Sequence, residues 1–72
     1  MNVQFLKFKA YKAVKGSKDK AILIRLDLIA AIEPKTDHEN NEVGTVLHMV
    51  GGSVLGVVEK VSEVKVKMGM LG

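Results

Sequence analysis

Cysteine is absent from this sequence, and histidine and aromatic residues are scarce. Without cysteine there are no disulfide bonds or thiolate metal ligands, and two histidines, His38 and His48, are too few for a closed zinc site. A chain of 72 residues buries only about 60% of its unfolded surface, so its core gives a thin margin of stability. Self-association is the remaining common source of stability, and we expect a homo-oligomer.

Long apolar runs are also missing. Nothing approaches the roughly 18 apolar residues of a membrane-spanning helix, and the stretch from Met1 to Val14 has no apolar block or cleavage site of a secretion signal. Apolar residues still make up 47% of the chain. These features predict one cytoplasmic domain over 1–72, without a cofactor and without membrane association.

The N-terminal third alternates between apolar and polar positions. From Val3 to Val14, Leu6, Phe8 and Ala10 point one way while Phe5, Lys7, Lys9 and Tyr11 point the other. The stretch from Ala21 to Leu28 alternates again, with an inward set of Ile22, Ile24, Leu26 and Leu28. A period of two predicts strands, and the polar turn Lys15 to Lys20 between them predicts a hairpin.

The middle of the chain reads as further strands. The strand after Asp27 is expected to bend and run on until Pro34, which cannot donate a ladder hydrogen bond. The polar stretch Lys35 to Val43 predicts a mobile loop. The stretches Thr45 to Val50 and Ser53 to Val58 then flank Gly51-Gly52, a pair that favours a tight hairpin turn.

The C-terminal segment fits two structures. Val57, Val61, Val64 and Met68 share a helical stripe, whereas Val64 to Met68 also alternates as a strand does. We favour a short helix from about Glu59. The predicted fold is therefore α+β: a small twisted antiparallel meander or partial barrel of four or five strands with one C-terminal helix.

Three segments between Ala21 and Val64 resemble the small FlbD-like proteins, first known from flagellar gene clusters. The segments are Ile24 to Ile29 with Ile32-Glu33, then Thr45 to Gly52, then Val57 to Val64. The resemblance implies strands, a hairpin through a Gly turn, and a short acidic helix. Arg25 stands where the family tends to have Asn, and Lys60 where a capping Ser is usual. Similar short sequences also occur in phages and mobile elements.

One predicted strand face interleaves aromatic rings with cations. It carries Phe5, Lys7, Lys9 and Tyr11, and Arg25 on the neighbouring strand extends it. Rings can stack bases and lysines can meet phosphate, so this basic patch is a candidate site for a nucleotide, a single-stranded nucleic acid or another anionic partner. The alternative is an ordinary solvated outer face of an antiparallel sheet.

Other polar groups indicate no catalytic centre. Asp37, His38, Glu39 and Glu42 gather in one loop, but their spacing does not fit an EF-hand, so we interpret them as a solvated loop and predict no metal site. His48 has no nucleophile in a recognisable motif near it, which favours a structural histidine. We therefore expect no enzyme activity.

The C-terminal stripe carries more apolar side chains than a small sheet needs to cover it. We predict an oligomer interface from Val61, Val64, Met68, Met70 and Leu71, although part of this stripe is expected to pack on the protein's own sheet. The leading hypothesis is a non-enzymatic, homo-oligomeric interaction module that binds an acidic protein or other anionic partner. The alternative is capture of a nucleotide or single-stranded nucleic acid.

Overall fold

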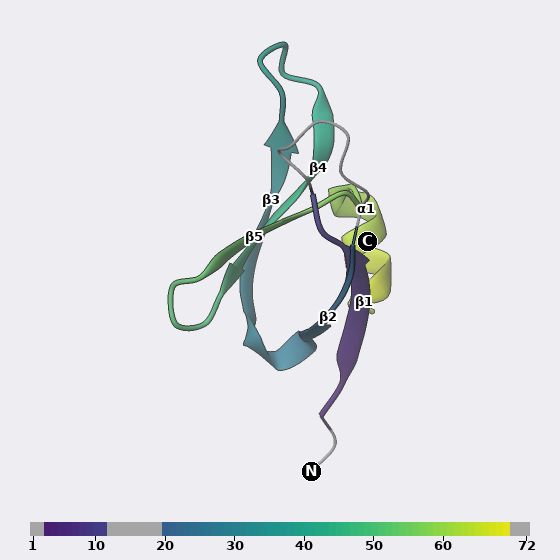
Figure 1. Ribbon diagram of the computed structural model, residues 1–72, viewed down its shortest axis with the longest axis vertical. Coiled ribbons are helices and arrows are strands. Elements are labelled where there is room, and N and C mark those ends of the chain that lie inside the picture. Colours follow the sequence, from purple (N-terminus) through teal and green to yellow (C-terminus); the bar gives the residue numbers. More distant parts are fainter. Residues whose placement is uncertain (1–2, 12–19, 70–72) are drawn as a thin grey trace.

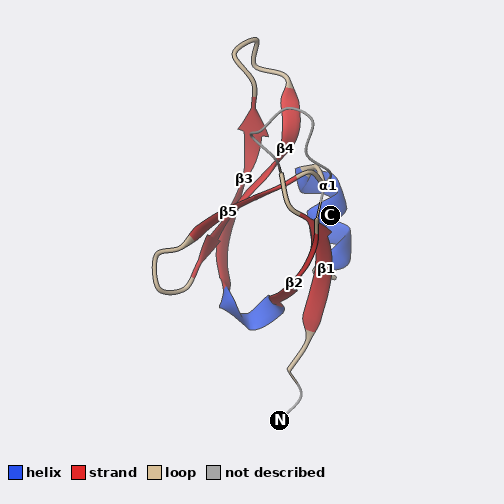
Figure 2. Ribbon diagram, in the orientation of Figure 1, coloured by secondary structure: helices blue, strands red, loops and turns tan. Residues whose placement is uncertain are grey.

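The computed structural model describes residues 3–11 and 20–69 and has five strands and one α-helix over that part of the chain (Figures 1 and 2). In chain order the elements are β1 (Phe5–Lys9), β2 (Ala21–Arg25), the 3₁₀ turn η1 (Leu26–Leu28), β3 (Ile29–Thr36), β4 (Glu42–Met49), β5 (Val54–Val57) and α1 (Val61–Lys67). This small α+β architecture confirms the predicted fold class. The predicted turn residues from Lys15 to Asp19 lie outside the described part.

The antiparallel pair β1–β2 follows the alternation in the sequence. Phe8 stands opposite Ile22 and Leu6 opposite Ile24. Leu6, Phe8 and Ile24 are buried, as predicted, and they join residues of the other elements in one core. The remaining buried hydrophobic side chains of this core are Leu47, Val57 and Val64.

Two expectations for the next segment were wrong. Leu28 is exposed, because the chain leaves the strand path in the η1 turn and no longer alternates faces there. The strand after this turn also continues beyond Pro34 to Thr36. Proline is accepted because β3 is the edge strand of a sheet with the order β3-β4-β5, so one side of its backbone needs no donor.

The β4–β5 hairpin confirms the predicted turn at the glycine pair. Gly51 and Gly52 both have positive φ, at 98° and 97°. The Met49 N–H donates to the Ser53 carbonyl at 2.8 Å. The connection between these two residues therefore consists of Val50, Gly51 and Gly52, one residue more than the glycine pair alone. The β3–β4 loop spans only the residues between Thr36 and Glu42, because both strands extend into the polar stretch.

The helix α1 confirms the helical interpretation of the C-terminal segment, although it begins at Val61 instead of Glu59. Lys60 at the N-cap provides no side-chain hydrogen bond. Instead, the Glu42 carboxylate from β4 accepts the Val61 N–H at 2.9 Å. A distant acidic side chain therefore caps this helix, which suits the partial positive charge of a helix N-terminus.

The two sheets are joined by one bridge and are not closed into a barrel over the described residues. At this bridge Ala10 pairs with Val57, the Tyr11 N–H donates to the Gly56 carbonyl at 2.8 Å, and the Val58 N–H donates to the Lys9 carbonyl at 2.9 Å. At the opposite end β2 continues through η1 into β3 (Figure 1). The core lies between these two connections.

Glycine at position 44 is required by close packing of β4 against β5. A Cβ there would overlap the backbone carbonyl oxygen of Val57, which cannot move without breaking the strand pair. We expect Gly44→Ala to lower the free energy of unfolding by about 1–3 kcal/mol, measured by urea denaturation. The control is Gly56→Ala, whose Cβ would lie 3.4 Å from the Cβ of Tyr11 and fits with little movement. Equal stability of the two variants would contradict this packing.

Candidate functional site

The outer face of the β1–β2 sheet alternates apolar and cationic side chains. Phe5 stands directly opposite Arg25, and Lys7 stands opposite Leu23. Phe5 is 54% exposed and Leu23 is 67% exposed, although both are large and apolar. Lys7 and Lys9 are exposed on the same face. We call these five residues (Phe5, Lys7, Lys9, Leu23 and Arg25) the outer face of β1–β2.

Arg25 does not offer a free charge on this face. Its guanidinium donates from Nε to Asp27 Oδ1 at 3.1 Å and from Nη2 to Asp27 Oδ2 at 2.7 Å. Hydrogen bonding within the pair raises the pKa of Arg25 and lowers the pKa of Asp27. Lys7 and Lys9 make no ion pair within residues 3–11 and 20–69. They are therefore the free cations of this face over that part of the chain.

Tyr11 lies apart from the other predicted site residues. Its N–H donates to the Gly56 carbonyl of β5 at 2.8 Å, which places the Tyr11 Cβ next to Gly56. The ammonium of Lys35 lies 4.7 Å from the centre of its ring. The two rings predicted to share a surface therefore lie on different sheets: Phe5 on β1–β2, and Tyr11 over the outer side of β5, next to a cation from β3.

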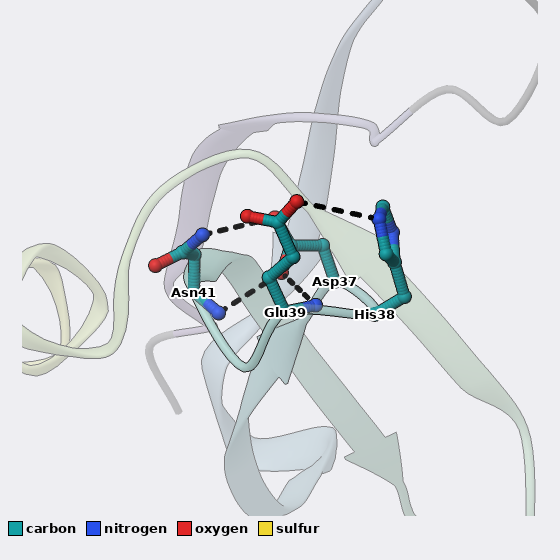
Figure 3. Close-up of polar contacts among 4 residues, drawn as sticks. All are labelled: Asp37, His38, Glu39 and Asn41. Atoms are coloured by element: carbon teal, nitrogen blue, oxygen red, sulfur yellow. Dashed lines mark hydrogen bonds and ion pairs between the residues drawn. The ribbon is translucent and has the colours of Figure 1, made fainter.

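Asp37 holds the acidic loop in a hydrogen-bonded turn (Figure 3). One oxygen of its carboxylate accepts the N–H groups of Glu39 at 2.8 Å and Asn41 at 2.9 Å. Asn40 adopts a positive φ of 64°, which asparagine tolerates well. The side chain of Asp37 thus supplies hydrogen bonds that hold the backbone of the loop that the sequence predicted between β3 and β4.

The two histidines lie beside carboxylates of nearby residues. Among the described residues, no three His, Cys, Asp or Glu side chains converge to hold a metal ion. His38 lies 3.5 Å from Glu39 at the exposed turn. His48 contacts the carboxylate of Glu33 on the neighbouring strand at 2.7 Å, and both side chains are partly exposed. This cross-strand contact agrees with a structural histidine.

The predicted oligomer stripe is divided between the core and the surface. Val64 is fully buried against the protein's own sheets, so its side chain has no surface for a second copy. Val61 is half-buried, and Met68 packs against the core from its edge. Met70 and Leu71 lie outside the described residues. Val66, which the stripe did not include, is 76% exposed and lines a shallow depression with Ser62, Glu63 and Lys67.

Sequence reasoning missed Glu59, which connects three elements. Its two carboxylate oxygens accept the Lys9 N–H at 3.1 and 3.0 Å, and its carbonyl accepts the hydroxyl of buried Thr45 at 2.6 Å. It therefore ties β1 and β4 to the start of α1. No local pattern could identify this role, because the partners lie 50 and 14 residues away along the chain.

Comparisons with protein-family models, curated proteins and solved structures find no significant match to this chain. The resemblance to FlbD-like proteins therefore stays a prediction. No helix in the described residues is long and apolar enough to cross a membrane. The fold is that of a small α+β protein, and its candidate sites lie on the surfaces of its two sheets and its helix.

The hydrogen bonds to Asp37 generate a pH-dependent prediction. Bonds from the Asn41 and Glu39 N–H groups lower the pKa of Asp37 from its ordinary value of 3.8. A lowered folded-state pKa means that the stabilisation is present above 3.8 and is lost as pH falls through the folded-state value. NMR titration should show the amide shifts of Glu39 and Asn41 moving with a midpoint below 3.8. Asp37→Asn should abolish this titration, and an unchanged titration in that variant would contradict the assignment.

Proposed function

We propose that this chain is a non-enzymatic, homo-oligomeric interaction module that binds an acidic protein segment in the cytoplasm. The observation that supports this most strongly is the outer face of β1–β2, where exposed Phe5 and Leu23 alternate with Lys7 and Lys9. Large apolar side chains exposed side by side on a small domain mark an interaction surface. Lysines between them select a partner that carries carboxylates.

The chemistry of this face favours a segment with apolar and acidic side chains. Phe5 and Leu23 contact apolar groups of the partner, and burial of this area supplies most of the affinity. Lys7 and Lys9 meet its carboxylates, increase the association rate and exclude basic partners. Arg25 contributes through the planar surface of its guanidinium, because its charge is already balanced by Asp27.

The geometry gives less support to capture of a nucleotide or single-stranded nucleic acid. Stacking of successive bases needs neighbouring rings on one surface. Phe5 lies on β1, whereas Tyr11 packs over Gly56 beside Lys35 on the other sheet. An extended partner could contact the lysines, but it would find only Phe5 as an aromatic platform on this face.

The small core supports the proposal of a homo-oligomer. The described part of the chain fully buries few large hydrophobic side chains, and Phe5, Leu23, Val54 and Val66 are each more than half exposed. A chain of this size gains stability by covering such side chains with another protein surface. Val66 on α1 lies outside the predicted stripe, and Val64 of that stripe already stabilises the protomer.

Fluorescence anisotropy tests the binding face with two labelled probes, a dodecapeptide of Glu and Leu and an oligothymidylate of equal length. The peptide should bind the wild type, and the affinity should fall as salt rises. Replacing Lys7 and Lys9 together with Gln should weaken peptide binding by about tenfold, because two exposed ion pairs contribute up to about 1 kcal/mol each.

The matched control replaces Lys60 and Lys65 with Gln, which removes the same charge from α1 and its N-cap. It should leave peptide affinity nearly unchanged. Equal losses in both double variants would show that net charge alone drives binding and would contradict the proposed face. Tight binding of oligothymidylate that is lost in Tyr11→Ala, without peptide binding, would favour nucleic-acid capture instead.

A further inference from the structure

The open edges of the two sheets differ in how they are protected. The end of β1 contacts β5 through one bridge, whereas the outer sides of β2 and β3 pair with no strand of the described residues. The edge of β3 carries Pro34 and two register breaks, between Ile29 and Ala31 and between Lys35 and Thr36. Proline and bulges are the usual means of preventing pairing at an edge. The five residues of β2 carry neither.

The hydrogen bonds of β1–β2 show which backbone groups this edge presents. The Leu26 N–H donates to the Gln4 carbonyl at 2.9 Å, and the Ala10 N–H donates to the Lys20 carbonyl at 2.8 Å. Backbone groups alternate sides along a strand, so the even-numbered residues of β2 face β1. The N–H and C=O groups of Ala21, Leu23 and Arg25 therefore point away from β1. They have no backbone partner within the described residues.

We infer that β2 pairs with β2 of a second copy of this chain, antiparallel and centred on Leu23. This inference rests on the homo-oligomer of the proposed function and specifies its interface. A twofold axis at Leu23 sets Leu23 opposite itself and Ala21 opposite Arg25 of the other copy. Each outward N–H and C=O group of β2 then gains a partner, as in an isologous interface.

The side chains at this axis suit self-pairing. Leu23 is 67% exposed and would be covered by the same residue of the second copy. Arg25 meets small Ala21, and its charge is already neutralised by Asp27. Lys7 of the two copies would stand three strand spacings apart, about 14 Å. That separation exceeds the screening length of about 8 Å at physiological salt, so their repulsion is weak.

Pairing of β2 with β2 would also enlarge the proposed binding surface. The two outer faces of β1–β2 would merge into one four-stranded surface, with the sequence β1, β2, β2, β1. The exposed Phe5 and the free Lys7 and Lys9 of both copies would then lie on the same side. An acidic segment would contact two sets of lysines, and its affinity would depend on dimer formation.

Light scattering after size-exclusion chromatography at micromolar concentration tests the interface. Leu23→Lys places two like charges at the axis and does not disturb the core, because the side chain is exposed. We expect a dimer for the wild type, with twice the 7.8 kDa mass of one chain, and a monomer for Leu23→Lys. The matched control Val66→Lys adds the same charge at a more exposed site on α1 and should remain a dimer.

The outcomes separate this inference from the proposed function. A dimer that persists in Leu23→Lys, whatever the behaviour of Val66→Lys, would overturn β2 pairing and leave the homo-oligomer intact. A monomeric wild type would contradict both, while the peptide-binding test of the outer face would remain independent. Circular dichroism of Leu23→Lys must match the wild type for a monomer to count as support.

A distance measurement tests the register without altering Leu23. The chain has no cysteine, so Lys9→Cys provides a single attachment site for a spin label. Strand spacings and rises place the two Lys9 Cα atoms about 20 Å apart across the proposed axis. Double electron–electron resonance should give a distance near this value, extended by the label arms. A distance well beyond that range would overturn the pairing even if a dimer forms.

Discussion

The contact between the end of β1 and the end of β5 holds this structure together. Within a few residues it includes the Ala10–Val57 bridge, the hydrogen bonds of Tyr11 and Val58, and the Glu59 carboxylate on the Lys9 N–H. A two-stranded ribbon is at best marginally stable alone, so β1–β2 depends on this contact and on the shared core. Phe8, Val57 and Val64 of that core are fully buried.

The contact between β1 and β5 also determines which surfaces remain exposed. It occupies the backbone of β1 near Lys9 and draws Tyr11 across β5, away from Phe5. Among the described residues, the outer face of β1–β2 keeps its exposed apolar side chains and lysines without ion pairs, and the outer side of β2 pairs with no strand. The proposed binding face and the proposed assembly edge thus lie on the same small sheet, so the complete binding surface of the proposed module would form on assembly.

The sequence predicted local features well. Period-two patterns located β1 and β2 and the inward positions of Leu6, Phe8 and Ile24, and the glycine pair located the β4–β5 turn. These predictions succeeded because strand alternation and positive φ are properties of neighbouring residues. Pro34 misled because its tolerance depends on β3 being an edge strand, which only the sheet order decides.

The candidate site was predictable only in part, because its geometry depends on distant contacts. Phe5, Lys7 and Lys9 share a face because alternation places them there, but Tyr11 is positioned by its hydrogen bond to the Gly56 carbonyl and lies next to Lys35. The pairing of Arg25 with Asp27 arises where the strand turns into η1. Capping of α1 by Glu42 and the contacts of Glu59 link residues with no shared pattern.

The central claim is that the contact between β1 and β5 makes both sheets unfold as one cooperative unit. Native-state hydrogen exchange in increasing denaturant tests it. The amides of Phe8 and Ile24 in the β1–β2 ladder and of Leu47 in β4 should exchange with one common free energy and one denaturant dependence. In Glu59→Ala that free energy should fall equally for all three. Exchange of Phe8 and Ile24 at a lower free energy, while Leu47 stays protected in both proteins, would contradict the account.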